Sequence, residues 1–95
     1  MDSVELLGMR KQLLNELFSA THEIENRGKT LAEAERLYRV ALAKRTLELK
    51  QAGYPVTVIT DITRGDENVA ALRFDRDVAR EMLKAIYERI NVMKW

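Results

Sequence analysis

A chain of 95 residues is long enough for one small domain with a single core. It is 46% hydrophobic and 33% charged, which is too apolar for a disordered chain and is typical of amphipathic helices with solvated faces. Sixteen Lys and Arg against fifteen Asp and Glu leave a net charge of +1, so the chain lacks the basic excess on which nucleic-acid binding usually depends. Cysteine is absent, which excludes disulfides, thiolate metal ligands and a Cys nucleophile.

The N-terminal sequence is acidic at its start and has no continuous apolar segment, so we expect no signal peptide. No apolar run approaches the ~20 residues that a membrane helix needs. We therefore expect a protein of the cytoplasm that has no membrane partner.

The first predicted helix runs from residue 3 to residue 26. Its apolar residues recur at spacings of three, four and seven and form one stripe: Leu6, Leu7, Leu13, Leu14, Leu17, Phe18 and Ile24. Asp2 or Ser3 is positioned to cap its start. Gly28 favours a helix end, and Thr30 with Glu33 has the form of a capping box, so we expect a break or sharp kink at residues 28–30.

The second predicted helix covers residues 31–52 and has a broad apolar arc that includes several alanines, which let a neighbouring helix come close. Gly53 and Pro55 end it. The third covers residues 66–92. Its start is ambiguous, because Asp61 and Thr63 are alternative caps, and we favour the later start with Asp66 as the cap.

The connector between these helices, residues 53–65, contains the β-branched run Val56 to Thr60. It is long for a link between packed helices, so it should hold structure of its own or contact a partner. We expect an extended segment that crosses the helix ends, or alternatively a strand that pairs with the same segment of a second copy. Crossover packing is the favoured interpretation.

Two short motifs in this region have structural explanations. Arg64-Gly65-Asp66 matches the string that integrins read on extracellular ligands, but a turn followed by a helix cap accounts for it here. The segment also resembles a helix-turn-helix in having a Gly between two candidate helices. Asp61 stands where that motif needs a small residue, and the "DEN" that follows Gly65 would present negative charge to phosphates, so we do not expect DNA recognition by this element.

Candidates for chemistry are few. His22 is the only histidine, and the numerous carboxylates have Arg or Lys at helical spacing, so charged helix faces are the expected interpretation. The sequence contains no Gly-rich phosphate loop, nucleophile elbow or Ser/His/Asp set. We therefore predict no catalytic residues, no metal site and no cofactor.

Two candidate contact sites remain. A basic ridge forms where Arg76, Arg80 and Lys84 are spaced by four, and such a ridge can follow a phosphate backbone. The acidic residues that flank it favour salt bridges within the protein or across an interface. The candidate partner-binding residues are those of the connector and the C-terminal aromatic: Tyr54, Val56, Val58, Ile59 and Trp95.

Residues 31 to 81 resemble small helical proteins encoded in tailed-phage and prophage genomes of Gram-positive bacteria. The shared patterns are A-E-A-E-x-x-Y-R at Ala32 to Arg39, G-x-P-V-T at Gly53 to Thr57, and G-x-x-x-V-A-x-L-R at Gly65 to Arg73. The resemblance covers about half of the chain. It implies a phage-related origin and a bacterial-host cytoplasm, and it carries over no functional residues because that group has no assigned activity.

Together these observations predict a single all-α domain, in which two long helices and an N-terminal helical segment form a hairpin or bundle. Apolar arcs on long helices are hard to cover with 95 residues, so we expect a homo-oligomer, most simply a dimer. The predicted function is protein–protein interaction or assembly without catalysis, with a phage or host protein as a possible partner. The alternative is a small accessory DNA-binding protein for phage DNA transactions that uses the basic ridge.

Overall fold

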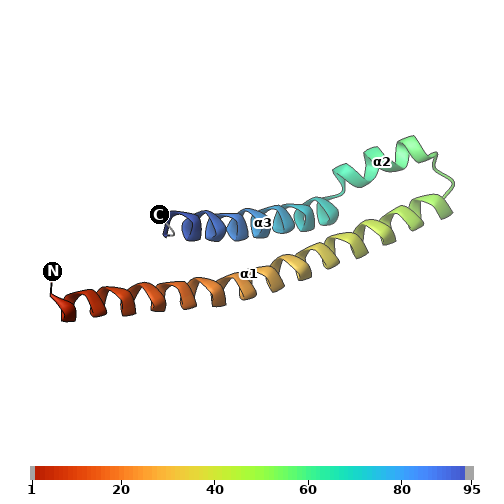
Figure 1. Cartoon of the computed structure of the whole chain (residues 1–95). Coiled ribbons are helices and arrows are strands. Elements are labelled where there is room, and N and C mark those ends of the chain that lie inside the picture. The colour runs from red at the N-terminus through yellow and green to blue at the C-terminus, as the bar shows by residue number, and fades with distance from the viewer. Residues whose placement is uncertain (1, 94–95) are drawn as a thin grey trace.

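The computed structural model describes residues 2–93, and this part of the chain is helical with no strand. It contains α1 (Ser3–Gln51), α2 (Val56–Gly65) and α3 (Glu67–Met93), and α3 runs back antiparallel along α1 (Figure 1). The result is a rod of 76 × 18 × 16 Å. The prediction of an all-α protein is therefore confirmed. No helix within the described residues is long and apolar enough to cross a membrane.

α1 is one continuous helix, so the predicted break at residues 28–30 is wrong. The Thr30 hydroxyl donates to the Asn26 carbonyl at 3.0 Å within the helix instead of capping a new one. Contacts with α3 hold α1 on both sides of Gly28, through Glu23 on one side and Glu35 on the other. A glycine inside a helix costs only about 1 kcal/mol relative to Ala, so packing along α3 overrides the local signal.

The ends of α1 follow local sequence. The Asp2 carboxylate accepts a hydrogen bond from the Glu5 backbone N–H at 2.8 Å and caps the first turn. At the other end Gly53 has a φ of 89°, a left-handed conformation that glycine adopts without a steric penalty. The backbone N–H of Tyr54 then bonds to the Leu49 carbonyl at 3.2 Å, which closes the helix.

α2 lies within the connector, so the predicted extended segment or strand is wrong. Pro55 takes φ −64° and ψ 152° and starts the helix, because its fixed φ suits this position and its missing N–H is not needed there. The β-branched residues are tolerated because Ile59 and Thr63, one helical turn apart, are both buried. The Thr63 hydroxyl also donates to the Thr60 carbonyl at 3.0 Å.

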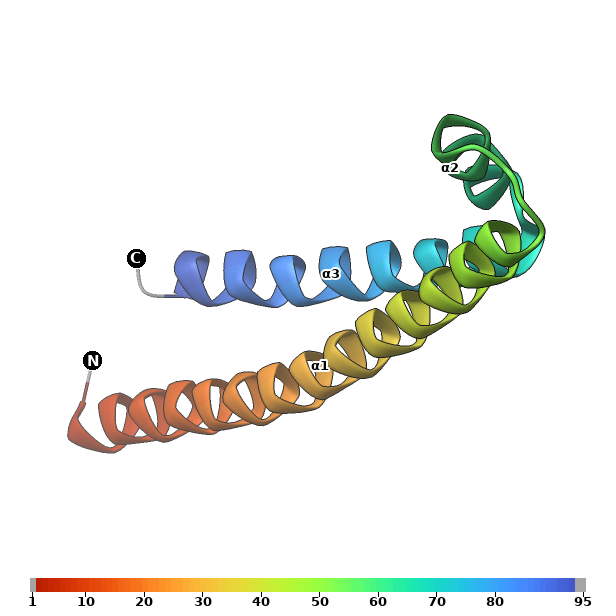
Figure 2. The same cartoon turned by 90° about the vertical axis from the view of Figure 1, so that its right-hand side faces the viewer.

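α3 begins at Glu67, the later of the two starts considered from the sequence. The Asp66 carboxylate accepts a hydrogen bond from the Val69 backbone N–H at 3.0 Å and so caps the helix. Asp61 and Thr63, the alternative caps, lie inside α2. Asp66 has an extended backbone between the two helices, which sets α2 to one side of the α1–α3 pair (Figure 2).

The buried core is thin and lies along one face of each helix. The apolar side chains that are buried within the described residues are Ala20, Leu49, Ile59, Val69, Ala79 and Ile86. Two long helices in contact can cover only one stripe on each other, so the remaining apolar residues of both stay exposed. A hairpin of this kind leaves surfaces that a third element would normally cover.

Candidate interaction interface

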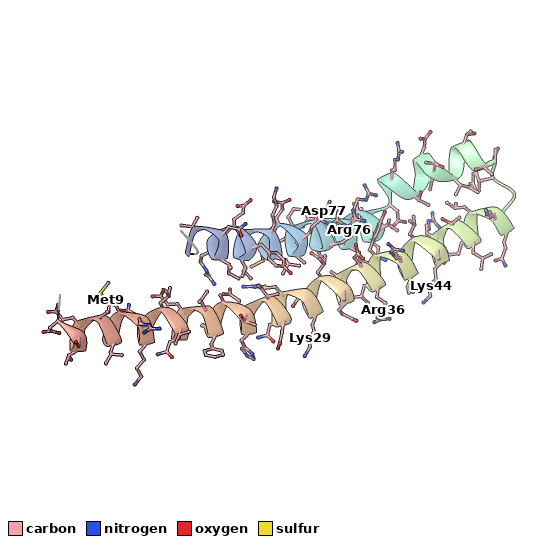
Figure 3. All side chains as sticks on the ribbon, viewed as in Figure 1. Met9, Lys29, Arg36, Lys44, Arg76 and Asp77 are labelled. Carbon is pink, nitrogen blue, oxygen red and sulfur yellow. The ribbon has the colours of Figure 1, made fainter. Side chains whose placement is uncertain are left out.

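The titratable groups do not converge on a chemical site in the described residues. No group of three or more His, Asp or Glu side chains is placed to hold a metal ion in that range. A hydrogen bond from Arg36 lowers the pKa of the Glu33 carboxyl, and the same bond raises the pKa of Arg36. Both side chains are exposed, and they form a surface ion pair at 2.6 Å. Arg36 projects from α1 on the same side as Lys29 and Lys44 (Figure 3).

The predicted basic ridge on α3 is largely engaged in contacts inside the molecule. Arg76 bonds to Asp77 at 2.9 Å, which raises the pKa of Arg76, and its guanidinium lies 4.6 Å from the centre of the Tyr38 ring. Arg80 donates to Glu35 of α1 at 3.1 Å. Lys84 is exposed. The ridge thus contributes to the contact between α1 and α3, with two of its three cations already beside carboxylates.

The connector presents only part of its predicted contact surface. Tyr54, Val56 and Val58 are exposed, whereas Ile59 is 4% exposed and packs inside the molecule. Ile59 is buried because it lies on the inner face of a helix, whereas an extended segment would have alternated its side chains. Trp95 lies outside the described residues.

A cleft of about 460 Å³ separates α2 from α1, beside this surface. Lys50, Arg64 and Arg73 are its cationic lining residues, and no carboxylate of residues 2–93 lines it. The Arg73 guanidinium also donates to the Arg64 carbonyl at 3.5 Å, which ties α3 to the end of α2. The cleft is open and its floor includes the buried Ile59 and Thr63.

The most distinctive surface is the N-terminal part of α1, which extends beyond the end of α3 (Figure 1). The contact between Glu23 and Arg89, at 2.6 Å, lies one turn before α3 ends at Met93. Ala20 is still buried and Leu17 half-buried, and every described residue before Leu17 is exposed. We call residues 3–16, which no other part of the described chain covers, the overhang.

The overhang and the turn that follows it carry seven exposed large apolar side chains. Their exposed fractions run from 43% to 78%: Val4, Leu6, Leu7, Met9, Leu13, Leu14 and Phe18. Leu6 and Leu13 continue, at spacings of seven and four, the stripe that Leu17 and Ala20 present to α3. Met9 projects from α1 on the side on which α3 lies farther along (Figure 3).

Sequence reasoning identified this stripe but did not name its residues as a contact surface. Its apolar spacing predicted a helix face, and the missing information was where α3 would end. α3 has 27 residues and α1 has 49, so an antiparallel pair joined at one end must leave one end of α1 uncovered. The contact surface had been predicted at the connector, at the other end of the rod.

Comparison with models of protein families, with curated proteins and with solved structures finds no match to this chain.

Proposed function

We propose that this chain is a non-enzymatic helical protein that acts through protein–protein contact or assembly and works as a homo-oligomer, most simply a dimer. The observation that carries the proposal is the set of seven exposed large apolar side chains between Val4 and Phe18. An exposed patch of this kind on a small protein usually marks an interface. The absence of catalysis is proposed from the sequence, which has no nucleophile set or phosphate loop.

Energetics support a covered overhang. Burying one Leu side chain contributes about 1.5–3 kcal/mol, so covering even part of this stripe is worth several kcal/mol. Most helical stability in proteins comes from packing an apolar face. The overhang has 14 residues, Ser3 to Glu16, and no packing of its own. A partner on this stripe would stabilise the helix and remove the apolar surface from water.

A phage or prophage origin is part of the proposal and is supported by the resemblance of residues 31 to 81 described above. It places the protein in the cytoplasm of a bacterial host, where a phage or host protein is a further candidate partner. The overhang, residues 3–16, lies outside the segment that carries this resemblance. The argument for its contact surface therefore rests on the structure and not on the resemblance.

The test is the solution mass by light scattering, at two protein concentrations and at low and high salt. We expect a dimer or larger species that resists high salt, because apolar contact is not screened. Leu13→Glu should return the protein to a monomer, since it places a charge in the middle of the stripe. Gln12→Glu is the matched control, because Gln12 is an exposed polar neighbour outside the apolar stripe. A monomer in all four conditions would overturn the proposal.

The alternative function, DNA binding by Arg76, Arg80 and Lys84, is distinguished from assembly by a second experiment. Fluorescence anisotropy with a duplex oligonucleotide should show binding that weakens steeply with salt if phosphates are contacted. Reversing all three charges should abolish that binding and leave the solution mass unchanged. Salt bridges to Asp77 and Glu35 make this alternative the weaker of the two, since DNA would have to compete with them.

A further inference from the structure

The overhang has an exposed apolar stripe, and the position beside it, beyond the end of α3, can hold one helix of the same length. We propose that it pairs with the overhang of a second copy of this chain, antiparallel, so that each overhang continues the line of the other copy's α3. This inference rests on the proposed function and adds the partner segment, the direction and the register. It makes a closed dimer with a two-fold axis near residues 9 and 10 of each copy.

Continuity with the existing interface is the first argument. In the hairpin the inner face of α1 is buried at Ala20 and half-buried at Leu17 and Ile24, and this burial ceases where α3 ends. The same face continues into the overhang as Leu13 and Leu6. A second helix placed end to end with α3 would therefore meet an apolar stripe of the kind that α3 itself meets.

Length is the second argument. The exposed segment of one copy, residues 3–16, has the same length as the segment of the second copy that would cover it. When residues 3–16 of two copies lie antiparallel and in full overlap, Leu6 of each copy faces Leu13 of the other. Met9 faces Arg10 between these two layers, and the aliphatic part of Arg10 can lie over the thioether while its charge stays in water. An isologous contact of this kind closes on itself and covers the Leu6, Met9 and Leu13 face of both overhangs.

Charge selects the antiparallel direction. The overhang carries Glu5, Arg10, Lys11 and Glu16. A parallel pair would set each of these beside its own copy, which places like charges together. In the antiparallel pair Glu5, Lys11 and Glu16 face uncharged residues, and only the two Arg10 side chains lie near each other, beside the two-fold axis. The first turn of α1 would also meet the last turn of the other copy's α3, so that the positive end of one helix dipole faces the negative end of another.

Cysteine cross-linking tests the register, and the chain is suited to it because it has no native cysteine. Leu6→Cys and Leu13→Cys are prepared as separate proteins and oxidised either alone or mixed. We expect covalent dimers in the mixture and few in either protein alone, because a disulfide requires Cβ atoms about 4 Å apart. Met9→Cys should cross-link on its own, since it lies beside the two-fold axis.

Other outcomes would overturn the inference in distinct ways. Efficient linking of Leu6→Cys or Leu13→Cys alone, with no gain on mixing, would indicate a parallel pair. Linking of Leu6→Cys to Tyr54→Cys would indicate that the overhang binds the connector of the next copy. A salt-resistant dimer with either pattern would leave the proposed function standing, whereas a monomeric wild type would remove both. Circular dichroism of each variant checks that the helices remain formed.

Discussion

Asp66 and Arg45 join the turn between α2 and α3 to the C-terminal part of α1, with Asp66 Oδ2 lying 3.2 Å from Arg45 Nε. The other carboxylate oxygen, Oδ1, accepts the hydrogen bond from the Val69 backbone N–H. Arg45 also bonds to Glu48 within α1 at 3.1 Å. One carboxylate therefore caps α3 and fixes that cap against α1. The Asp of the Arg-Gly-Asp string is thus engaged inside the molecule.

Replacing Asp66 should separate its two roles. Asp66→Ala removes both the cap and the charge, and we expect a loss of about 1–2 kcal/mol in the free energy of unfolding. Asp66→Asn keeps a capping side chain of similar strength and loses only the ion pair with Arg45, so its effect should be smaller. Urea unfolding followed by circular dichroism measures both. Equal stability of Asp66→Ala and the wild type would contradict the assigned cap.

Two glycine substitutions should have opposite signs. Gly28 lies in the helix interior with open space where a Cβ would be, so Gly28→Ala should stabilise the protein by about 0.5–1 kcal/mol. Gly53 has a positive φ, so Gly53→Ala should destabilise it by about 1–2 kcal/mol even though no atom obstructs the Cβ. Thermal unfolding compares the two variants. A destabilising Gly28→Ala would indicate that α1 breaks at that point.

The packing of α2 can be tested with two apolar residues from the same helix. Ile59 is 4% exposed, so Ile59→Ala should cost about 2–5 kcal/mol through the lost burial and the cavity that remains. Val56 is 70% exposed, and Val56→Ala should change the stability by no more than about 0.5 kcal/mol. Chemical denaturation measures both. Similar small effects would mean that α2 does not pack on the hairpin as described.

Acidification should affect the Glu33–Arg36 pair in a defined direction. Folding lowers the pKa of Glu33 because Arg36 donates a hydrogen bond to the carboxylate. Its contribution to stability is therefore complete above the unfolded pKa of ~4.3 and is lost as the pH falls through the lower folded value. NMR titration should find a lower Glu33 pKa in the wild type than in Arg36→Gln. An unchanged pKa in that variant would show that the pair does not persist in solution.

Local chemistry made several features of this fold predictable. The helical class followed from apolar residues spaced at three, four and seven, and the start of α1 at Asp2 and its end near Gly53 depended on groups within one turn. The cap at Asp66 was among the alternatives for the same reason. The helix ends depend on hydrogen bonds between near neighbours, and the residues that form those bonds can be read from the sequence.

Tertiary contacts decided the rest. Gly28 and Thr30 locally favour a helix break. However, α3 contacts α1 on both sides of them, and this packing outweighs a difference in helix propensity of about 1 kcal/mol. The connector became a helix because burial of Ile59 and Thr63 on the hairpin outweighed the β preference of its residues. Whether Leu6 and Leu13 are core or surface depends on where α3 ends relative to α1, a distance between segments about 80 residues apart in the chain. The position of the end of α3 relative to α1 is set only when the chain folds. The burial of Leu6 and Leu13 depends on it, because a side chain is buried only where another segment packs against it.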